Sequence, residues 1–187
     1  VTTEVNSADI LMVVGDESSP ADDEIAERDY LVNTRGHTVT YIDDSASGED
    51  TLAAADLNDA LIVSASVGSG NIGSGLFDYS GGILTFESFH WDDMQMTVAF
   101  GQVDASTDIQ IDDPSSYGAA GLSGIVTVYD DDGAGAIAYR GGLADEANLI
   151  ASLDIGGGDF QPAAFGIARA LRWWTALAPR ELAWGPS

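Results

Sequence analysis

The sequence predicts an α/β domain built on a mostly parallel sheet with helices on both faces, extended by antiparallel strands in its C-terminal half. In the first half, short apolar runs alternate with helical segments over short links, as in parallel strands joined by right-handed crossovers. In the second half, short strands lie between glycines and aspartates, which is typical of antiparallel pairing. The 187 residues fit one domain, with 1–8 as a leader, 9–178 as the core and 179–187 as a tail or linker.

The first half contains four strand patterns and one long helix pattern. The run DILMVVGD at 9–16 is continuously apolar, as in a strand buried on both faces. A helix is expected from Pro20 to about Thr34, with Ser19 as its N-cap and carboxylates in its first turn. Its buried side is expected to hold Ala21, Ile25, Leu31 and Val32. The remaining elements are strands at 37–44, 59–66 and 82–89, a short helix over 48–58 and a helical turn within 73–81.

The second half is expected to form short antiparallel strands and one closing helix. The glycines of DIGGGDF are typical of a hairpin between Leu153 and Phe160. ARALRWWTALA at 168–178 predicts a helix that packs through Leu171, Trp174 and Ala178. The strands are expected within 107–113, 124–132, 135–141, 148–155 and 160–167.

Negative charge dominates the composition. The chain has 31 acidic and 6 basic residues, a net charge of −25, yet 45% of its residues are hydrophobic, so a core can form. All six basic residues are arginine. Self-repulsion of this size is screened at about 1 M salt, where the Debye length is roughly 3 Å. The composition therefore favours a salt-adapted source.

The same charge limits the partners and the location. An acidic surface repels nucleic acid and anionic membranes, and no apolar run reaches the roughly 20 residues of a membrane span. The absence of cysteine excludes disulfides, thiolate metal sites and a cysteine nucleophile. The start at Val1 rather than Met favours a processed protein or an excised domain. We expect an extracellular or cell-surface location, with other domains, proteins or carbohydrate as partners.

Several segments together resemble a known family. They are ILMVVGD, GHTVTYIDD, the stretch from DLNDALIVSASVGSGNIG to ESFHWDDMQMT, GLSGIVTVYD and FGIARALRWW, which span roughly residues 9–175. This pattern resembles the flavodoxin-like, class I glutamine amidotransferase-like domains of secreted and multidomain prokaryotic proteins, and the resemblance implies a three-layer sandwich. The family's catalytic cysteine is absent and no histidine follows His90, so glutaminase chemistry is not implied.

A ligand site in this fold class lies at the carboxyl ends of the parallel strands. GSGNIG at 68–73 has the spacing of a phosphate-binding loop, but it follows the third strand rather than the first. It can present backbone N–H groups to an anion, or it can be a tight turn that needs glycine. The residues expected to line such a site are Asp16, Ser66, Gly68, Ser69, Gly70, Asn71 and His90.

TFESFHWDDM at 85–94 offers a catalytic alternative. His90 could act as a base, with Glu87 or Asp92 as helper and Ser66 as nucleophile. The G-x-S-x-G elbow of hydrolases is absent, and strand alternation would put Glu87 and His90 on opposite faces. The structural alternative is that His90 and Trp91 cap the strand, while Asp92 and Asp93 cap a short helix through MQMT.

Calcium is the one cofactor that the sequence suggests. Asp130, Asp131 and Asp132 form a carboxylate cluster before a glycine, although the EF-hand spacing is not met. A solvated hairpin tip explains the same cluster.

Together these patterns favour a non-catalytic binding or structural module of an extracellular or surface protein from a salt-adapted organism. One alternative is a hydrolase with a Ser/His/acid site at the carboxyl ends of the parallel strands. Another is a subunit of a cell-surface or virion assembly that makes contacts through Trp173 and Trp184. The oligomeric state is left open.

The charge predicts salt-dependent stability. The melting temperature, followed by circular dichroism, should climb between dilute buffer and molar salt, because screening relieves the self-repulsion of the folded chain. A melting temperature that does not respond to salt would contradict salt adaptation.

Overall fold

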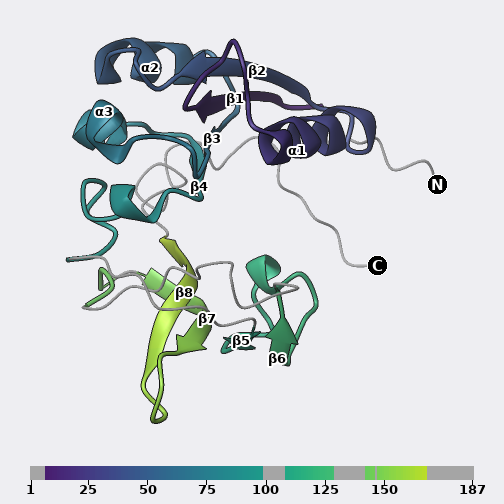
Figure 1. The fold of residues 1–187 in the computed structure, drawn as a ribbon, viewed down its shortest axis with the longest axis vertical. Coiled ribbons are helices and arrows are strands. Elements are labelled where there is room, and N and C mark those ends of the chain that lie inside the picture. The colour runs from purple at the N-terminus through teal and green to yellow at the C-terminus, as the bar shows by residue number, and fades with distance from the viewer. Residues whose placement is uncertain (1–6, 99–107, 129–141, 146, 168–187) are drawn as a thin grey trace, which may run out of the picture.

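A four-stranded parallel sheet forms the first half of the fold (Figure 1). The computed structural model describes residues 7–98, 108–128, 142–145 and 147–167 of the chain. The strands are β1 (Asp9–Val14), β2 (Thr38–Asp43), β3 (Ala60–Val63) and β4 (Gly82–Thr85). They are paired in the order β2-β1-β3-β4, with every pair parallel. This is the order of a doubly wound sheet up to its fourth strand, and it confirms the predicted fold class.

Helices cover both faces of this sheet and make the three layers. On one face, α1 (Asp22–Asn33) packs its Leu31 against apolar side chains of β1 and β3. The other face is covered by α2 (Gly48–Ala55), α3 (Ser69–Ile72) and the 3₁₀ turn η1 (Gly73–Leu76). The two faces alternate along β1, with Ile10, Met12 and Val14 on the first and Leu11 and Val13 on the second.

Two glycines allow α2 and η1 to approach each other closely. A Cβ added to Gly75 would lie 2.5 Å from Cα of Gly48, and a Cβ on Gly48 would lie 2.8 Å from Cα of Gly75. Any side chain at either position would push backbone against backbone. The close approach lets Leu76, which is fully buried, reach the core beneath α2.

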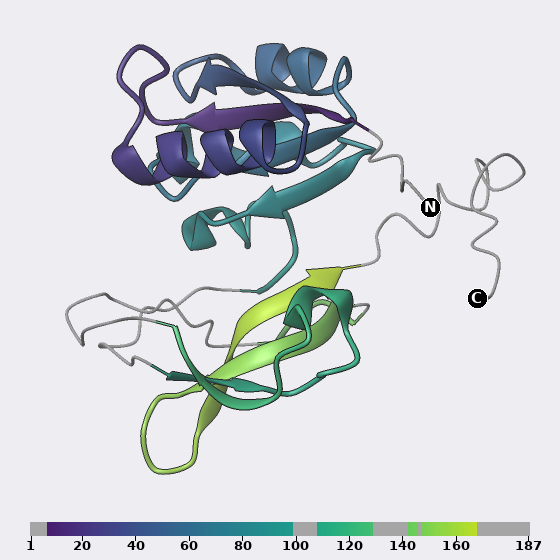
Figure 2. The same ribbon diagram turned by 90° about the vertical axis from the view of Figure 1, so that its right-hand side faces the viewer.

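The second half forms an antiparallel sheet of its own rather than extending the first one (Figure 2). Its strands are β5 (Asp108–Ile111), β6 (Gly124–Thr127), β7 (Ala147–Asp154) and β8 (Phe160–Ile167), in the order β6-β5-β7-β8. The 3₁₀ turn η3 (Tyr117–Ala119) lies between β5 and β6. The hairpin predicted at DIGGGDF is confirmed: β7 and β8 pair as far as Asp154 and Phe160, and the three intervening glycines all have positive φ.

The segment after β4 connects the two sheets. The amide of Ala144 donates to the carbonyl of Met96 at 2.9 Å, and Thr97 forms a β-bridge with Leu143. The Trp91 and Phe165 rings pack edge to face, with centroids 4.9 Å apart. Residues 91–98 therefore hold the antiparallel sheet near the β4 edge of the parallel one.

The long helix begins later than predicted. Ser19 is not its N-cap, because the amide of Ser19 donates to the carbonyl of Asp16 in a turn that precedes the helix. Ala21 occupies the N-cap position, and Oε2 of Glu24 accepts its amide at 2.7 Å. The expected buried side was also wrong in part: Ala21 and Val32 are exposed, Ile25 and Leu31 are half-buried, and the buried residue is Glu24.

The predicted fourth strand is wrong beyond Thr85. The chain leaves the sheet there and forms the 3₁₀ turn η2 (Ser88–His90), so strand alternation does not govern Glu87 and His90. The short helix expected through MQMT does not form either. Gln95 has φ of +53°, a left-handed conformation that ends the turn begun at Asp92.

Some predictions fall outside the described residues. They are the strand at 135–141, the aspartates at 130–132 and the closing helix at 168–178. Among the helices that the structure describes, none is both long and apolar enough to cross a membrane.

The glycine contact predicts a large effect of one methyl group. Gly75→Ala should destabilise the fold by about 1–3 kcal/mol, because the new Cβ overlaps the Gly48 backbone. Urea unfolding measures the difference. Gly70→Ala is the matched control, since a Cβ there meets no atom within 4 Å, and it should change the unfolding free energy by no more than about 0.5 kcal/mol. Equal effects at both positions would contradict the close packing of α2 and η1.

Candidate functional site

The loops that follow β1, β2 and β3 meet at the carboxyl edge of the parallel sheet, as predicted. The amide of Gly15 donates to Oγ of Ser66 at 2.9 Å, which joins the loops after β1 and β3. The amide of Glu17 donates to Oδ2 of Asp43 at 3.3 Å, which joins the loops after β1 and β2. Asp16 lies on the same edge, but its carboxylate accepts from the amide and hydroxyl of Ser18 within its own turn.

Ser66 is hydrogen-bonded to a buried carboxylate. Its hydroxyl donates to Oε1 of Glu24 at 2.5 Å, while Oε2 of Glu24 accepts the amide of Ala21. Glu24 is only 3% exposed. The sequence indicated Glu24 only as an acidic residue in the first turn of a helix, and its inward orientation depends on the position of Ser66, 42 residues away.

The glycine-rich loop at 68–73 binds a carboxylate of the protein itself. The amide of Gly68 donates to Oδ2 of Asp44 at 2.6 Å, and the side-chain amide of Asn71 donates to Oδ1 at 3.0 Å. Asp44 is 6% exposed and sits where an external anion would approach these donors. Among the residues predicted to bind a ligand, Gly68 and Asn71 are therefore occupied, whereas Gly70 is exposed.

His90 is buried and has a structural contact. Its ring is fully buried, and Nε2 donates to the carbonyl of Gly73 at 2.8 Å, joining η2 to η1. Burial lowers the pKa of His90, and the Gly73 bond and the nearby Asp93 and Asp92 oppose this only in part. In the described part of the chain, Nδ1 of His90 has no hydrogen-bond partner. A neutral ring tolerates this better than a charged one, because its Nδ1 carries no proton when Nε2 donates to Gly73.

The predicted catalytic residues are not brought together. Oε1 of Glu87 accepts the amide of Phe89 at 2.8 Å and so caps η2. Burial raises the pKa of Glu87, and the Phe89 bond lowers it to a smaller extent. Within the described residues, the His90 ring makes no hydrogen bond to a serine or to the Glu87 carboxylate; the backbone amide of His90 donates to the carbonyl of Glu87 at 3.2 Å, and Asp92 acts on the ring only through its charge.

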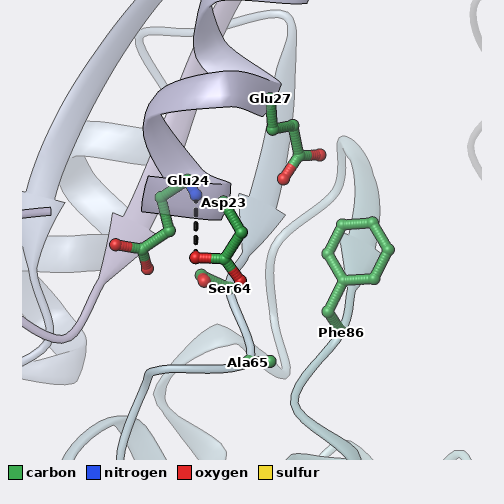
Figure 3. Close-up of a pocket in the computed structure, with 6 residues that line it drawn as sticks. All are labelled: Asp23, Glu24, Glu27, Ser64, Ala65 and Phe86. Atoms are coloured by element: carbon green, nitrogen blue, oxygen red, sulfur yellow. Dashed lines mark hydrogen bonds between the residues drawn. The ribbon is translucent and has the colours of Figure 1, made fainter. Parts of the chain in front are cut away.

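An acidic pocket of about 240 Å³ lies between α1 and the ends of β3 and β4 (Figure 3). Carboxylate side chains of α1 lie on one side and Phe86 on the other, with the chain at Ser64 and Ala65 between them. Burial raises the pKa of Glu27, and the charges of Asp23 and Glu24 raise it further. We define the acidic pocket by the six residues that line it: Asp23, Glu24, Glu27, Ser64, Ala65 and Phe86.

The structure does not assign a metal to the pocket. In the part of the chain that is described, no group of three or more histidine, aspartate or glutamate side chains has an arrangement that could hold a metal ion. The aspartates at 130–132, for which the sequence left a solvated hairpin tip and a calcium site as alternatives, lie outside the described residues. Calcium binding there stays a prediction.

Comparison with known proteins does not place the chain in a family. No family model matches the sequence, and no curated protein matches it. The resemblance to class I glutamine amidotransferase-like domains therefore stays a prediction.

The buried histidine predicts sensitivity to acid. The pKa of His90 is lowered in the folded protein, so below the ordinary value of 6.5 the unfolded chain takes up a proton before the folded one does. The unfolding free energy of the parent should fall as the pH drops through 6.5, until the lowered pKa is passed.

His90→Gln tests this assignment, because glutamine can still donate to the Gly73 carbonyl but does not titrate. Denaturant unfolding at several pH values should show a weaker pH dependence in this variant than in the parent. The same dependence in both proteins would mean that His90 titrates normally in the fold.

Proposed function

We propose that this domain is a non-catalytic binding or structural module of an extracellular or surface protein from a salt-adapted organism. One observation carries the proposal: the polar groups at the carboxyl edge of the sheet are bonded to one another or to the backbone. Asp44 accepts from Gly68, Glu87 accepts from Phe89, and His90 donates to Gly73. Such bonds stabilise loops, whereas a catalytic centre keeps its base directed toward a nucleophile or a substrate.

The surface and the second sheet support a binding role. The described parts of the chain contain one ion pair, between Arg28 and Asp29 at 2.6 Å, so few of their carboxylates are neutralised by arginine. Among the described strands β6 pairs with β5 alone, its Ile125 is exposed, and Tyr117 of η3 is 96% exposed. Exposed apolar and aromatic side chains of this kind are suited to contact with another domain, a protein or a carbohydrate.

A hydrolase is the second candidate, and one contact favours it. The 2.5 Å bond from Ser66 to Glu24 pairs a hydroxyl with a buried carboxylate, and a carboxylate can act as a general base. In such a hydrolase Glu24 would be the general base, the role that the sequence suggested for His90. An assembly subunit remains a prediction, because Trp173 and Trp184 lie outside the described residues.

Hydrolysis assays separate the first two functions. The parent, Ser66→Ala and His90→Gln should be assayed in molar salt against chromogenic esters and glycosides, with folding checked by circular dichroism. Ser80→Ala is the control, since Ser80 is exposed and away from Glu24. We expect the same background rate in all four proteins. Turnover by the parent that Ser66→Ala abolishes and Ser80→Ala keeps would overturn the non-catalytic proposal.

A further inference from the structure

The chain just before β1 joins the amino edge of the parallel sheet through three contacts of Ala8. The carbonyl of Ala8 accepts the amide of Thr38 at 2.9 Å, which extends the pairing of β1 with β2 by one residue. The amide of Ala8 donates to Nδ1 of His37 at 3.1 Å. The side chain of Ala8 packs against the core cluster that contains Ile10 and Ile62. Ala8 is therefore the residue that attaches this segment to the fold.

The backbone between α1 and β2 places the His37 ring beside Ala8. Gly36 follows α1 with φ of +75°, a left-handed conformation that glycine adopts without strain. Its amide donates to the carbonyl of Val32 at 3.2 Å, and the amide of His37 donates to the carbonyl of Leu31 at 3.0 Å. These bonds set the direction in which the chain leaves α1 and enters β2. The half-buried side chain of His37 consequently lies next to the start of β1.

The bond from Ala8 requires an Nδ1 without a proton. A backbone N–H can only donate, so the ring nitrogen that it meets must supply a lone pair. The neutral ring with its proton on Nε2 supplies one, whereas both nitrogens of the charged ring carry protons. Imidazole side chains ordinarily take up the second proton near pH 6.5. Two N–H donors then face each other across 3.1 Å, so this hydrogen bond is lost when the ring is charged.

The neighbouring contacts of β1 do not involve a histidine. The amide of Asp9 donates to Oδ2 of Asp59 at 2.9 Å, and the amide of Asp59 donates to the carbonyl of Asp9 at 2.7 Å. From Asp9 onward, β1 is also paired with β2 along its whole length. A charged His37 ring therefore acts on the segment before Asp9 and leaves the strand itself in the sheet.

We propose that His37 is a pH-sensitive contact, which anchors the chain before β1 at neutral pH and releases it in mild acid. Release exposes the amide and carbonyl of Ala8 to water and withdraws its side chain from the core cluster. The amino edge of the sheet then presents apolar surface that is covered at neutral pH. The proposal goes beyond the binding or structural role proposed above and does not rest on it.

Solvent exchange of backbone amides, measured by NMR on the full chain, tests the release. Protection is taken relative to an unstructured chain at the same pH, so the intrinsic pH dependence of exchange cancels. His90→Gln serves as the reference protein, because it leaves His37 as the only histidine. Between pH 7.5 and 5.0 the protection of the Ala8 and Thr38 amides should fall about tenfold, or roughly 1.4 kcal/mol.

The amide of Asp44 is the internal standard for this experiment. It donates to the carbonyl of Val14 at 2.9 Å, at the opposite end of the same two strands. Its protection should stay unchanged over the same pH range, because no histidine takes part in that bond.

Two variants at His37 separate the proton from the contact. His37→Asn keeps an acceptor, since Oδ1 of asparagine occupies nearly the place of Nδ1 and accepts an N–H at any pH. The protection of the Ala8 amide should then be the same at pH 7.5 and 5.0. His37→Leu removes the acceptor, so the protection should be low at both pH values.

A further variant tests the carboxylates, which also respond to acid. Within the described residues, the charged groups on the elements that meet at His37 are Asp9 on β1, Asp59 before β3 and Arg35 after α1. Asp59→Asn removes one charge and keeps an oxygen that can accept the amide of Asp9. The fall in protection at Ala8 should persist in this variant.

Three results would overturn the proposal. The first is equal protection of the Ala8 amide at pH 7.5 and 5.0 in the reference protein. The second is a fall that His37→Asn keeps or that Asp59→Asn abolishes, since either would assign the response to another group. The third is a fall at Ala8 without one at Thr38, because a single bond would then be lost while the segment stays in place.

Discussion

The arrangement of the loops at the sheet edge depends on the buried carboxylate of Glu24. One of its oxygens accepts the amide of Ala21 and so sets the start of α1, and the other accepts the hydroxyl of Ser66 from the loop after β3. Ser66 in turn accepts the amide of Gly15 at the end of β1. A carboxylate that is 3% exposed requires such partners, because an unpaired buried charge is strongly unfavourable. Glu24 thus ties two strand ends and a helix start to one point.

The same constraint recurs at Asp44. This carboxylate is also buried, and donors of the glycine-rich loop satisfy it. A surface with many carboxylates and few cations can bury an acidic group only where backbone or amide donors are available. The loops at the carboxyl edge supply those donors, which explains why a segment that resembles an anion-binding loop holds a side chain of the protein. This internal use of the donors supports a binding or structural role over catalysis at this edge.

Apolar side chains that are exposed within the described residues mark where further interactions of the domain are expected. The edge at β6 and the face of β4 beside α1 both present apolar side chains, and they differ in charge because the second adjoins the acidic pocket. A partner or segment for each must therefore differ as well.

Local patterns were sufficient to predict three parts of the fold. Apolar runs predicted the parallel strands, a proline followed by acidic residues predicted the α1 helix, and three glycines predicted the β7–β8 hairpin. Each of these signals acts within a few positions of the chain. They were also sufficient to place the loops after β1, β2 and β3 at one edge, because parallel strands end on the same side. The sequence thus determined the fold class, the acidic composition and the edge where polar groups gather.

The tertiary structure alone decided which of these groups form hydrogen bonds with one another. The Glu24–Ser66 and Asp44–Gly68 bonds join residues 42 and 24 positions apart, and the Gln95 backbone ends a turn that propensity favoured as a helix. Such contacts depend on how the loops pack in three dimensions. Loop packing leaves no periodic pattern in the sequence, so it could not be predicted from the residues.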